Sequence, residues 1–119
     1  MRKISAVLIL ACACVSCNDI IELEDISMEK VALVAPHDGA VLKTTLLRFS
    51  WEPIADADSY QIQIATPNFE APLQVYVDTT VAVNNLSVAL ERDSYEWRVK
   101  AKNSGYETNY SKQSFTVEE

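Results

Sequence analysis

Cysteine is absent from most of this chain. The 119 residues include three cysteines, Cys12, Cys14 and Cys17, and all of them lie in the first 17 positions. A domain formed by the remaining residues can therefore contain neither a disulfide nor a thiol nucleophile. Histidine is equally scarce, because His37 is the only one and lies in a Pro-His-Asp-Gly turn with no serine motif around it. We expect no catalytic triad and no metal-binding pair of histidines.

The sequence also lacks a membrane-spanning run and a surplus of positive charge. The longest uncharged apolar stretch, Ile4 to Val15, has 12 residues, whereas a spanning helix needs about 18. Without residues 1–16, which hold two bases and no acid, eight bases stand against 17 acids, a net charge of −9. This charge argues against nucleic-acid partners. It also disfavours adsorption to anionic lipid, so attachment to a membrane should be covalent.

The first 17 residues have the layout of a secretory signal. Arg2 and Lys3 precede the uncharged stretch, and the small Ser16 precedes Cys17. The ending Val-Ser-Cys resembles the lipobox of bacterial lipoproteins, whose cysteine thiol receives a diacylglyceryl group before cleavage. The resemblance implies that residues 1–16 are a lipoprotein signal peptide and that Cys17 is lipidated.

Three alternatives to lipidation at Cys17 remain. The sequence Ile-Leu-Ala before Cys12 fits the lipobox residue types better, but cleavage there would leave a shorter apolar stretch. Cys14 is a further candidate, and it also stands at a lipobox position that usually holds leucine. The last alternative is a plain secretory signal without a lipid.

Residues 17–29 form a predicted acidic tether, with no base before Lys30. Its acids are Asp19, Glu22, Glu24, Asp25 and Glu29. This segment resembles the acidic stretch that follows the lipidated cysteine in surface-exported lipoproteins of some Gram-negative bacteria. The resemblance implies a lipid-anchored protein displayed on the outer face of the outer membrane. The alternative is a solvated spacer that keeps the domain off the bilayer.

From Lys30 to Glu119 the apolar residues alternate with polar ones, which is the period of half-buried strands. About seven strands are predicted, at 30–35, 46–51, 59–65, 73–78, 81–88, 95–102 and 113–117. In the fifth of these the register changes at Asn84-Asn85, which predicts a bulge or bend. Breaker clusters separate the strands. Short strands at this spacing predict an all-β, immunoglobulin-like sandwich.

Two stretches resemble the fibronectin type III family. FSW at 49–51 is similar to its second strand, and YEWRVKAKN at 95–103 is similar to its sixth, with Gly105 and Ser111 following at roughly the family spacing. The resemblance covers residues 30–118. It implies that Tyr95 is the corner tyrosine, whose hydroxyl bonds a nearby backbone group while its ring packs inside. More loosely, VALVAPHDGAVL at 31–42 resembles the start of such domains in bacterial surface lipoproteins, some of which capture polysaccharides.

Few residues are candidates for chemistry. Asp56 and Asp58 have a spacing that suits a calcium loop, but the other ligands and the glycine of such a loop are missing, so a solvated turn is expected. Alternation places Trp51, Tyr60, Tyr95 and Trp97 in the core. Tyr106 and Tyr110 are not placed by the pattern, and they are the candidate ligand-binding residues, with packing against neighbouring strands as the alternative.

These observations predict a non-catalytic cell-surface lipoprotein that acts as an interaction or spacer module. The alternative is a glycan-binding surface lipoprotein of a polysaccharide-capture system. We expect no enzyme activity, no cofactor and no metal. The expected partners are the membrane, through the lipid anchor, and a protein or a polysaccharide.

Overall fold

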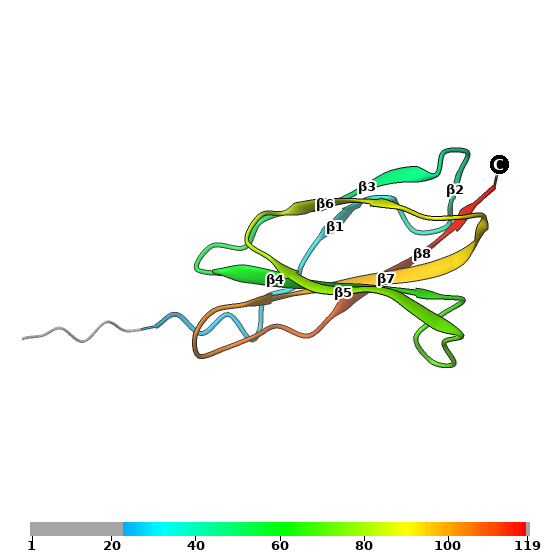
Figure 1. The fold of residues 1–119 in the computed structure, drawn as a ribbon. Helices are drawn as coiled ribbons and strands as arrows, with labels where there is room; N and C mark the ends of the chain where they lie inside the picture. The colour runs from blue at the N-terminus through cyan, green and yellow to red at the C-terminus, as the bar shows by residue number, and fades with distance from the viewer. Residues whose placement is uncertain (1–22, 119) are drawn as a thin grey trace, which may run out of the picture.

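The computed structural model describes residues 23–118, which form two β-sheets packed face to face (Figure 1). This part of the chain contains eight strands: β1 (Leu33–Ala35), β2 (Ala40–Leu42), β3 (Leu46–Trp51), β4 (Ser59–Thr66), β5 (Gln74–Val81), β6 (Asn85–Ala89), β7 (Asp93–Lys102) and β8 (Ser111–Val117). The first sheet has the order β1-β3-β6 and the second the order β2-β8-β7-β4-β5. Only the β2–β8 pair is parallel in the described residues. The predicted all-β sandwich is confirmed, with eight strands instead of seven.

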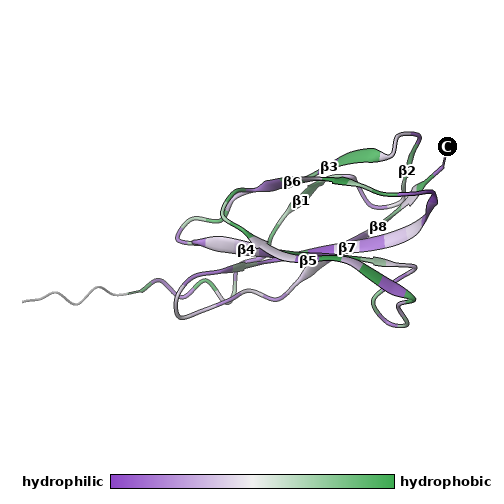
Figure 2. Ribbon diagram, viewed as in Figure 1, coloured by the Kyte–Doolittle hydropathy of each residue, from purple (hydrophilic) through white to green (hydrophobic). Residues whose placement is uncertain are grey.

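The alternation of the sequence determines which side of each strand is buried. Along β3, Leu47, Phe49 and Trp51 are buried, and the residues between them are at least partly exposed. Both hydrophobic and hydrophilic residues occur along the strands of the second sheet (Figure 2). One side of each central strand therefore faces the other sheet, and its other side faces solvent.

Aromatic rings fill the space between the sheets. Phe49 packs edge-on against Trp97 and Phe115, with ring centroids 5.1 and 5.6 Å apart. Trp51 packs in the same way against Tyr60 at 5.6 Å. Edge-to-face contacts of this kind add to the free energy of burying apolar area. The predicted core positions of Trp51, Tyr60 and Trp97 are confirmed, because all three side chains are at most 5% exposed.

Tyr95 occupies the corner position that the sequence implied. Its ring stacks on Phe115 with centroids 5.2 Å apart, and its hydroxyl donates a 2.6 Å hydrogen bond to the carbonyl of Glu91. Burial raises the pKa of Tyr95 to about 12, and the nearby Tyr76, Asp93 and Glu91 add to the rise. The hydroxyl thus ties the turn before β7 to the core.

Two parts of the predicted strand pattern differ from the structure. β2 was not predicted, because three residues are too few to show alternation, and its pairing with β8 depends on distant residues. The strand predicted at 81–88 is wrong as a single unit. β5 ends at Val81 and β6 begins at Asn85, so the chain crosses between the sheets there. Asn84 fixes this crossing, since its side chain donates to the carbonyl of Trp51 and its own carbonyl accepts from the Trp51 amide.

The segment before β1 packs on one end of the sandwich. Ile26 is only 3% exposed and belongs to the core cluster. The side chain of Asn103, in the β7–β8 loop, donates to the carbonyl of Glu24. Leu23 lies so close to Gly105 that a Cβ there would be 2.6 Å from a Leu23 methyl carbon. Part of the predicted acidic tether, Leu23 to Glu29, is therefore packed against the domain. The described chain ends near the opposite end of the sandwich (Figure 1).

Candidate functional site

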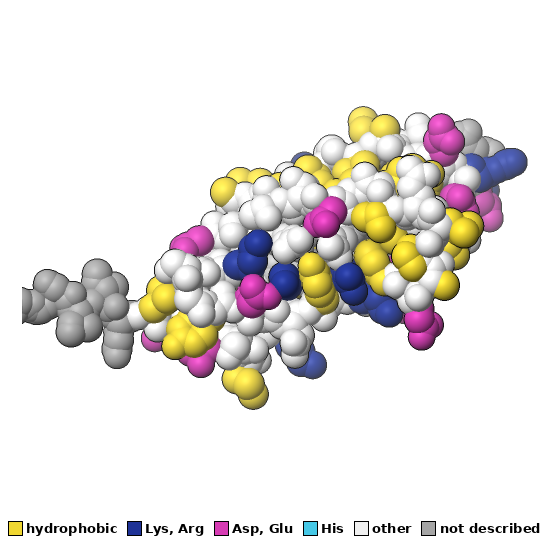
Figure 3. Space-filling model, turned by 60° about the horizontal axis from the view of Figure 1, so that its bottom comes forward, with side chains coloured by type: hydrophobic (Ala, Val, Ile, Leu, Met, Phe, Trp, Pro, Cys, Tyr) yellow, Lys and Arg dark blue, Asp and Glu magenta, His cyan; other side chains and the backbone are white. Residues whose placement is uncertain are grey.

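The outer face of the second sheet carries a group of polar and charged side chains. Along β7, residues 96, 98, 100 and 102 alternate with the buried ones and point away from the core. Gln61 and Gln63 of β4 pair with Lys100 and Arg98 of β7 and share this face. Figure 3 shows Lys and Arg side chains in a row across the molecule, with hydrophobic side chains beside them.

Arg98 is held by three different contacts. Its guanidinium carbon lies 4.1 Å from the ring centroid of Phe69 and 4.3 Å from that of Tyr110. The Nε donates a 2.8 Å hydrogen bond to Oε1 of Gln63. Both rings therefore contact the same guanidinium, and within the described residues they form no pair with one another. Within residues 23–118, Gln63 is the only hydrogen-bond partner of the guanidinium, which leaves its terminal nitrogens without one.

Each ring comes from a loop at a different end of the sheet. Phe69 lies between β4 and β5, and its amide donates a 2.9 Å hydrogen bond to Oε1 of Glu96. Tyr110 directly precedes β8. Because Arg98 pairs with Lys112 of β8, the side chain of Arg98 lies between the two loops along the strand direction.

Two lysines continue this arrangement along β7. The Nζ of Lys100 lies 4.9 Å from the Tyr110 ring centroid and 2.5 Å from a Glu107 carboxylate oxygen. The hydrogen bonds of the Lys102 Nζ within residues 23–118 are long, 3.4 Å to Gln61 Oε1 and 3.5 Å to Thr80 Oγ1. We use the name cation–aromatic row for five residues: Phe69, Arg98, Tyr110, Lys100 and Lys102.

Carboxylates border the row and respond to its charges. The hydrogen bond from Lys100, together with its charge, lowers the pKa of Glu107. The pKa of Asp78 is lowered mainly by a hydrogen bond from Gln61, with smaller contributions from the charges of Arg98 and Lys102. Both carboxylates therefore stay ionised at neutral pH.

Positive charge is concentrated on this face. Residues 23–118 contain eight bases and 14 acids. Four of the bases (Arg98, Lys100, Lys102 and Lys112) lie on the outer face, with three acids (Asp78, Glu96 and Glu107). The rest of the described chain therefore holds four bases and 11 acids. The face is a weakly positive region on a strongly acidic protein.

The structure places the two candidate tyrosines differently. Tyr110 belongs to the cation–aromatic row. Tyr106 lies in the β7–β8 loop, where its amide donates to the side chain of Asn103, and it is 39% exposed. The two rings form no pair. Sequence reasoning did not connect Tyr110 with Arg98, although the alternation along β7 already placed Arg98 and Lys100 on the outer side.

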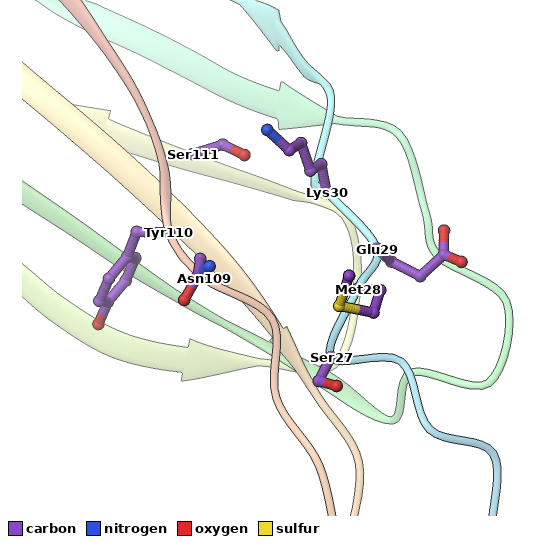
Figure 4. A pocket seen from close by; sticks show the side chains of 7 residues that line it. All are labelled: Ser27, Met28, Glu29, Lys30, Asn109, Tyr110 and Ser111. Atoms are coloured by element: carbon purple, nitrogen blue, oxygen red, sulfur yellow. The ribbon is translucent and has the colours of Figure 1, made fainter.

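A cleft of about 440 Å³ lies where residues 27–30 pass the start of β8. It is lined by Ser27, Met28, Glu29, Lys30, Asn109, Tyr110 and Ser111. Figure 4 shows Lys30 and Ser111 pointing toward one another, whereas the ring of Tyr110 extends away from both. The cleft and the row therefore use different sides of Tyr110.

The other candidates have ordinary surroundings or lie outside the described residues. His37 is exposed, and its Nδ1 lies 3.2 Å from the carbonyl oxygen of Asp38. Asp56 has a φ of 71° in an exposed turn. In residues 23–118 no group of three or more metal-ligating side chains could hold an ion. The same part of the chain has no helix that could cross a membrane. Cys17 and the predicted signal peptide lie outside the described range.

Comparison with solved structures identifies the type of β-sandwich. The chain is similar to fibronectin(III)-like modules of CbhA from Clostridium thermocellum, with a TM-score of 0.54, 14% identity, and 74% of this chain and 95% of that one covered. It is also similar to FN3tt (TM-score 0.53, 15% identity, 76% and 98% covered). A fibronectin type III domain derived from a human protein gives a TM-score of 0.52 at 10% identity, with 74% and 70% covered. No family model and no curated protein matches the sequence. The predicted fibronectin type III-like fold is confirmed.

Proposed function

We propose that this chain is a non-catalytic lipoprotein of the bacterial cell surface, anchored through Cys17 and acting as an interaction or spacer module. A fibronectin type III-like sandwich supports this role, because such modules commonly connect or bind without catalysing a reaction. The observation that carries the proposal is this fold, and the packing of residues 23–29 on one end of the domain determines how close the domain would lie to its anchor. Only residues 18–22 separate Cys17 from this packed segment.

The anchor is tested by intact-mass analysis of the full chain expressed in a lipoprotein-processing bacterial host. We expect a mature chain that begins at Cys17 and carries added acyl mass, and a Cys17→Ala variant without that mass. An acylated chain beginning at Cys12 would move the site, and an unacylated secreted chain would contradict the proposal.

Display on the outer membrane is tested separately. Protease added to intact cells should degrade the domain if it lies on the outer face, and a periplasmic marker protein should survive the same treatment. Protection of the domain until the outer membrane is permeabilised would place it inside.

The second candidate function is glycan binding at the surface. The cation–aromatic row favours it, because flat rings and hydrogen-bonding side chains on a rigid sheet suit the faces and hydroxyl groups of sugars. Of the two tyrosines proposed for this role, Tyr110 is part of the row.

A further inference from the structure

We infer that the cation–aromatic row binds an anionic polysaccharide whose sugar rings carry carboxylate or sulfate groups, with Arg98 as the principal contact to the anion. This inference rests on the glycan-binding function proposed above and specifies both its ligand and its site. Contacts within the protein hold the side chain of Arg98 in place before any ligand binds.

The guanidinium of Arg98 is preorganised for an oxyanion. Phe69 and Tyr110 both pack against it, and Gln63 accepts from its Nε. The terminal nitrogens have no hydrogen-bond partner within residues 23–118. A guanidinium binds a carboxylate or a sulfate through two parallel N–H donors. Binding therefore immobilises little additional side-chain freedom, which favours affinity.

The neighbouring groups suit a sugar. Arg98 and Lys100 both lie over the Tyr110 ring, so an anionic group bound at Arg98 would have a second cation nearby. Gln61, Gln63 and Asp78 lie on the same face and carry the amide and carboxylate groups that bind sugar hydroxyls. From Arg98 to Lys102 the strand rises about 13 Å, which exceeds the size of one sugar and favours a polymer.

The position of the row favours a polysaccharide over an acidic peptide. β7 is paired with β4 on one side and β8 on the other. Its backbone groups are thus used inside the sheet, and an extended peptide could not add to it as a further strand, which is the common mode of peptide recognition at a sheet. Only side chains remain for recognition, and those present can bind rings, hydroxyls and anions.

The distribution of charge favours an anionic ligand at this face. The outer face holds four bases and three acids, and the rest of the described chain four bases and 11 acids. An anionic polymer is repelled elsewhere on the protein, so this face is where it can approach most closely. The attraction should weaken as salt is added.

The test measures binding of the mature full chain, purified in detergent, to four probes: polygalacturonate, dextran sulfate, neutral dextran and polyglutamate. Isothermal titration calorimetry at low and moderate salt gives the dissociation constants. We expect binding to polygalacturonate or to dextran sulfate, and the comparison of these two shows whether carboxylate or sulfate is preferred. Neutral dextran and polyglutamate should bind at least about tenfold more weakly.

Variants connect the binding to the row. Arg98→Gln should weaken binding of the anionic polysaccharide about tenfold or more, because it removes a charge-assisted contact. Arg98→Lys should recover only part of the affinity, since it restores the charge without the planar fork. The matched control Lys43→Gln removes an equal charge from an exposed position on the loop between β2 and β3 and should change the affinity less than about twofold. Thermal unfolding verifies that each variant is folded.

Several results would overturn the inference. The inference is wrong if the parent protein binds neither anionic polysaccharide. It is also wrong if Arg98→Gln and Lys43→Gln lose affinity equally. Equal binding of polyglutamate would assign the row to an acidic polypeptide. Binding of neutral dextran that does not depend on Arg98 would overturn the inference and leave glycan binding itself standing.

Discussion

The two sides of β7 have opposite characters although they share one backbone. The residues that face the core, Tyr95, Trp97, Val99 and Ala101, are at most 1% exposed. The residues that alternate with them, Glu96, Arg98, Lys100 and Lys102, are charged and remain partly exposed. The inner side stabilises the fold by removing apolar area from water, which requires no directional bonds. The outer side makes directional contacts that each contribute little free energy at a hydrated surface. The fold therefore depends mainly on the inner side, and the outer side is available for binding.

Trp97→Ala is expected to have the largest effect and tests this division directly. Trp97 is fully buried and contacts Phe49, so its loss should lower the free energy of unfolding by about 3–5 kcal/mol. Lys100→Ala on the other side of the strand should cost at most about 1 kcal/mol. Urea denaturation followed by far-ultraviolet circular dichroism measures both. Similar losses in the two variants would show that the outer side supports the fold as strongly as the inner side.

Ile26→Ala tests how far the stabilising interior extends beyond the strands. Because Ile26 is buried among core residues, we expect a loss of about 2–4 kcal/mol. The control Met28→Ala, at a side chain that is 89% exposed, should change the free energy of unfolding by less than about 0.5 kcal/mol. If Ile26→Ala is as mild as its control, the segment before β1 does not contribute to the interior.

Tyr95→Phe removes one directional contact from the inner side and keeps the ring. The lost hydrogen bond to the Glu91 carbonyl should cost about 1–2 kcal/mol at neutral pH in urea denaturation. An unchanged free energy of unfolding would mean that the corner hydroxyl is not important for stability.

The same residue gives a pH dependence. The folded pKa of Tyr95, about 12, lies above its ordinary value of 10.0, so the unfolded chain releases this proton first. The free energy of unfolding should therefore fall as the pH rises from 10 toward 12. Denaturation at several pH values should show a smaller fall for Tyr95→Phe than for the parent protein. Identical pH profiles would assign the alkaline loss to other groups.

The smallest expected effect is on the outer side. A double-mutant cycle of Arg98→Met and Tyr110→Leu should give a coupling free energy of about 0.5–1 kcal/mol, the usual range for a cation over an aromatic ring near the surface. A coupling above about 2 kcal/mol would mean that the row also stabilises the fold. The inner and outer sides of β7 would then differ less in their contribution to stability.

Most of the fold could be predicted from the sequence, because alternation is a local property. The buried positions of Trp51, Tyr60, Tyr95 and Trp97 follow from period two alone. β2 and the crossing at Asn84 could not be predicted, since both depend on partners that are distant in the sequence. The packing of Ile26 was hidden for the same reason, as an isolated apolar residue among acids has no period.

The candidate site was less predictable than the fold. Tyr110 was identified, but its contact with Arg98 joins a loop residue to a residue of β7, and Phe69 comes from a second loop. No spacing in the sequence records such a contact. Tyr106 was a candidate beside Tyr110 because the alternation placed neither residue, whereas the structure gives Tyr110 cationic neighbours and leaves Tyr106 on the loop.

The packing of residues 23–29 also sets the reach and the direction of the domain. In the proposed anchored form, five residues join Cys17 to Leu23. A linker of this length spans about 18 Å when fully extended. The domain would then stand with its β7–β8 loop toward the bilayer and its β4–β5 loop toward the surroundings. Because the cation–aromatic row follows β7 between these two ends, a polymer lying along it would run outward from the membrane.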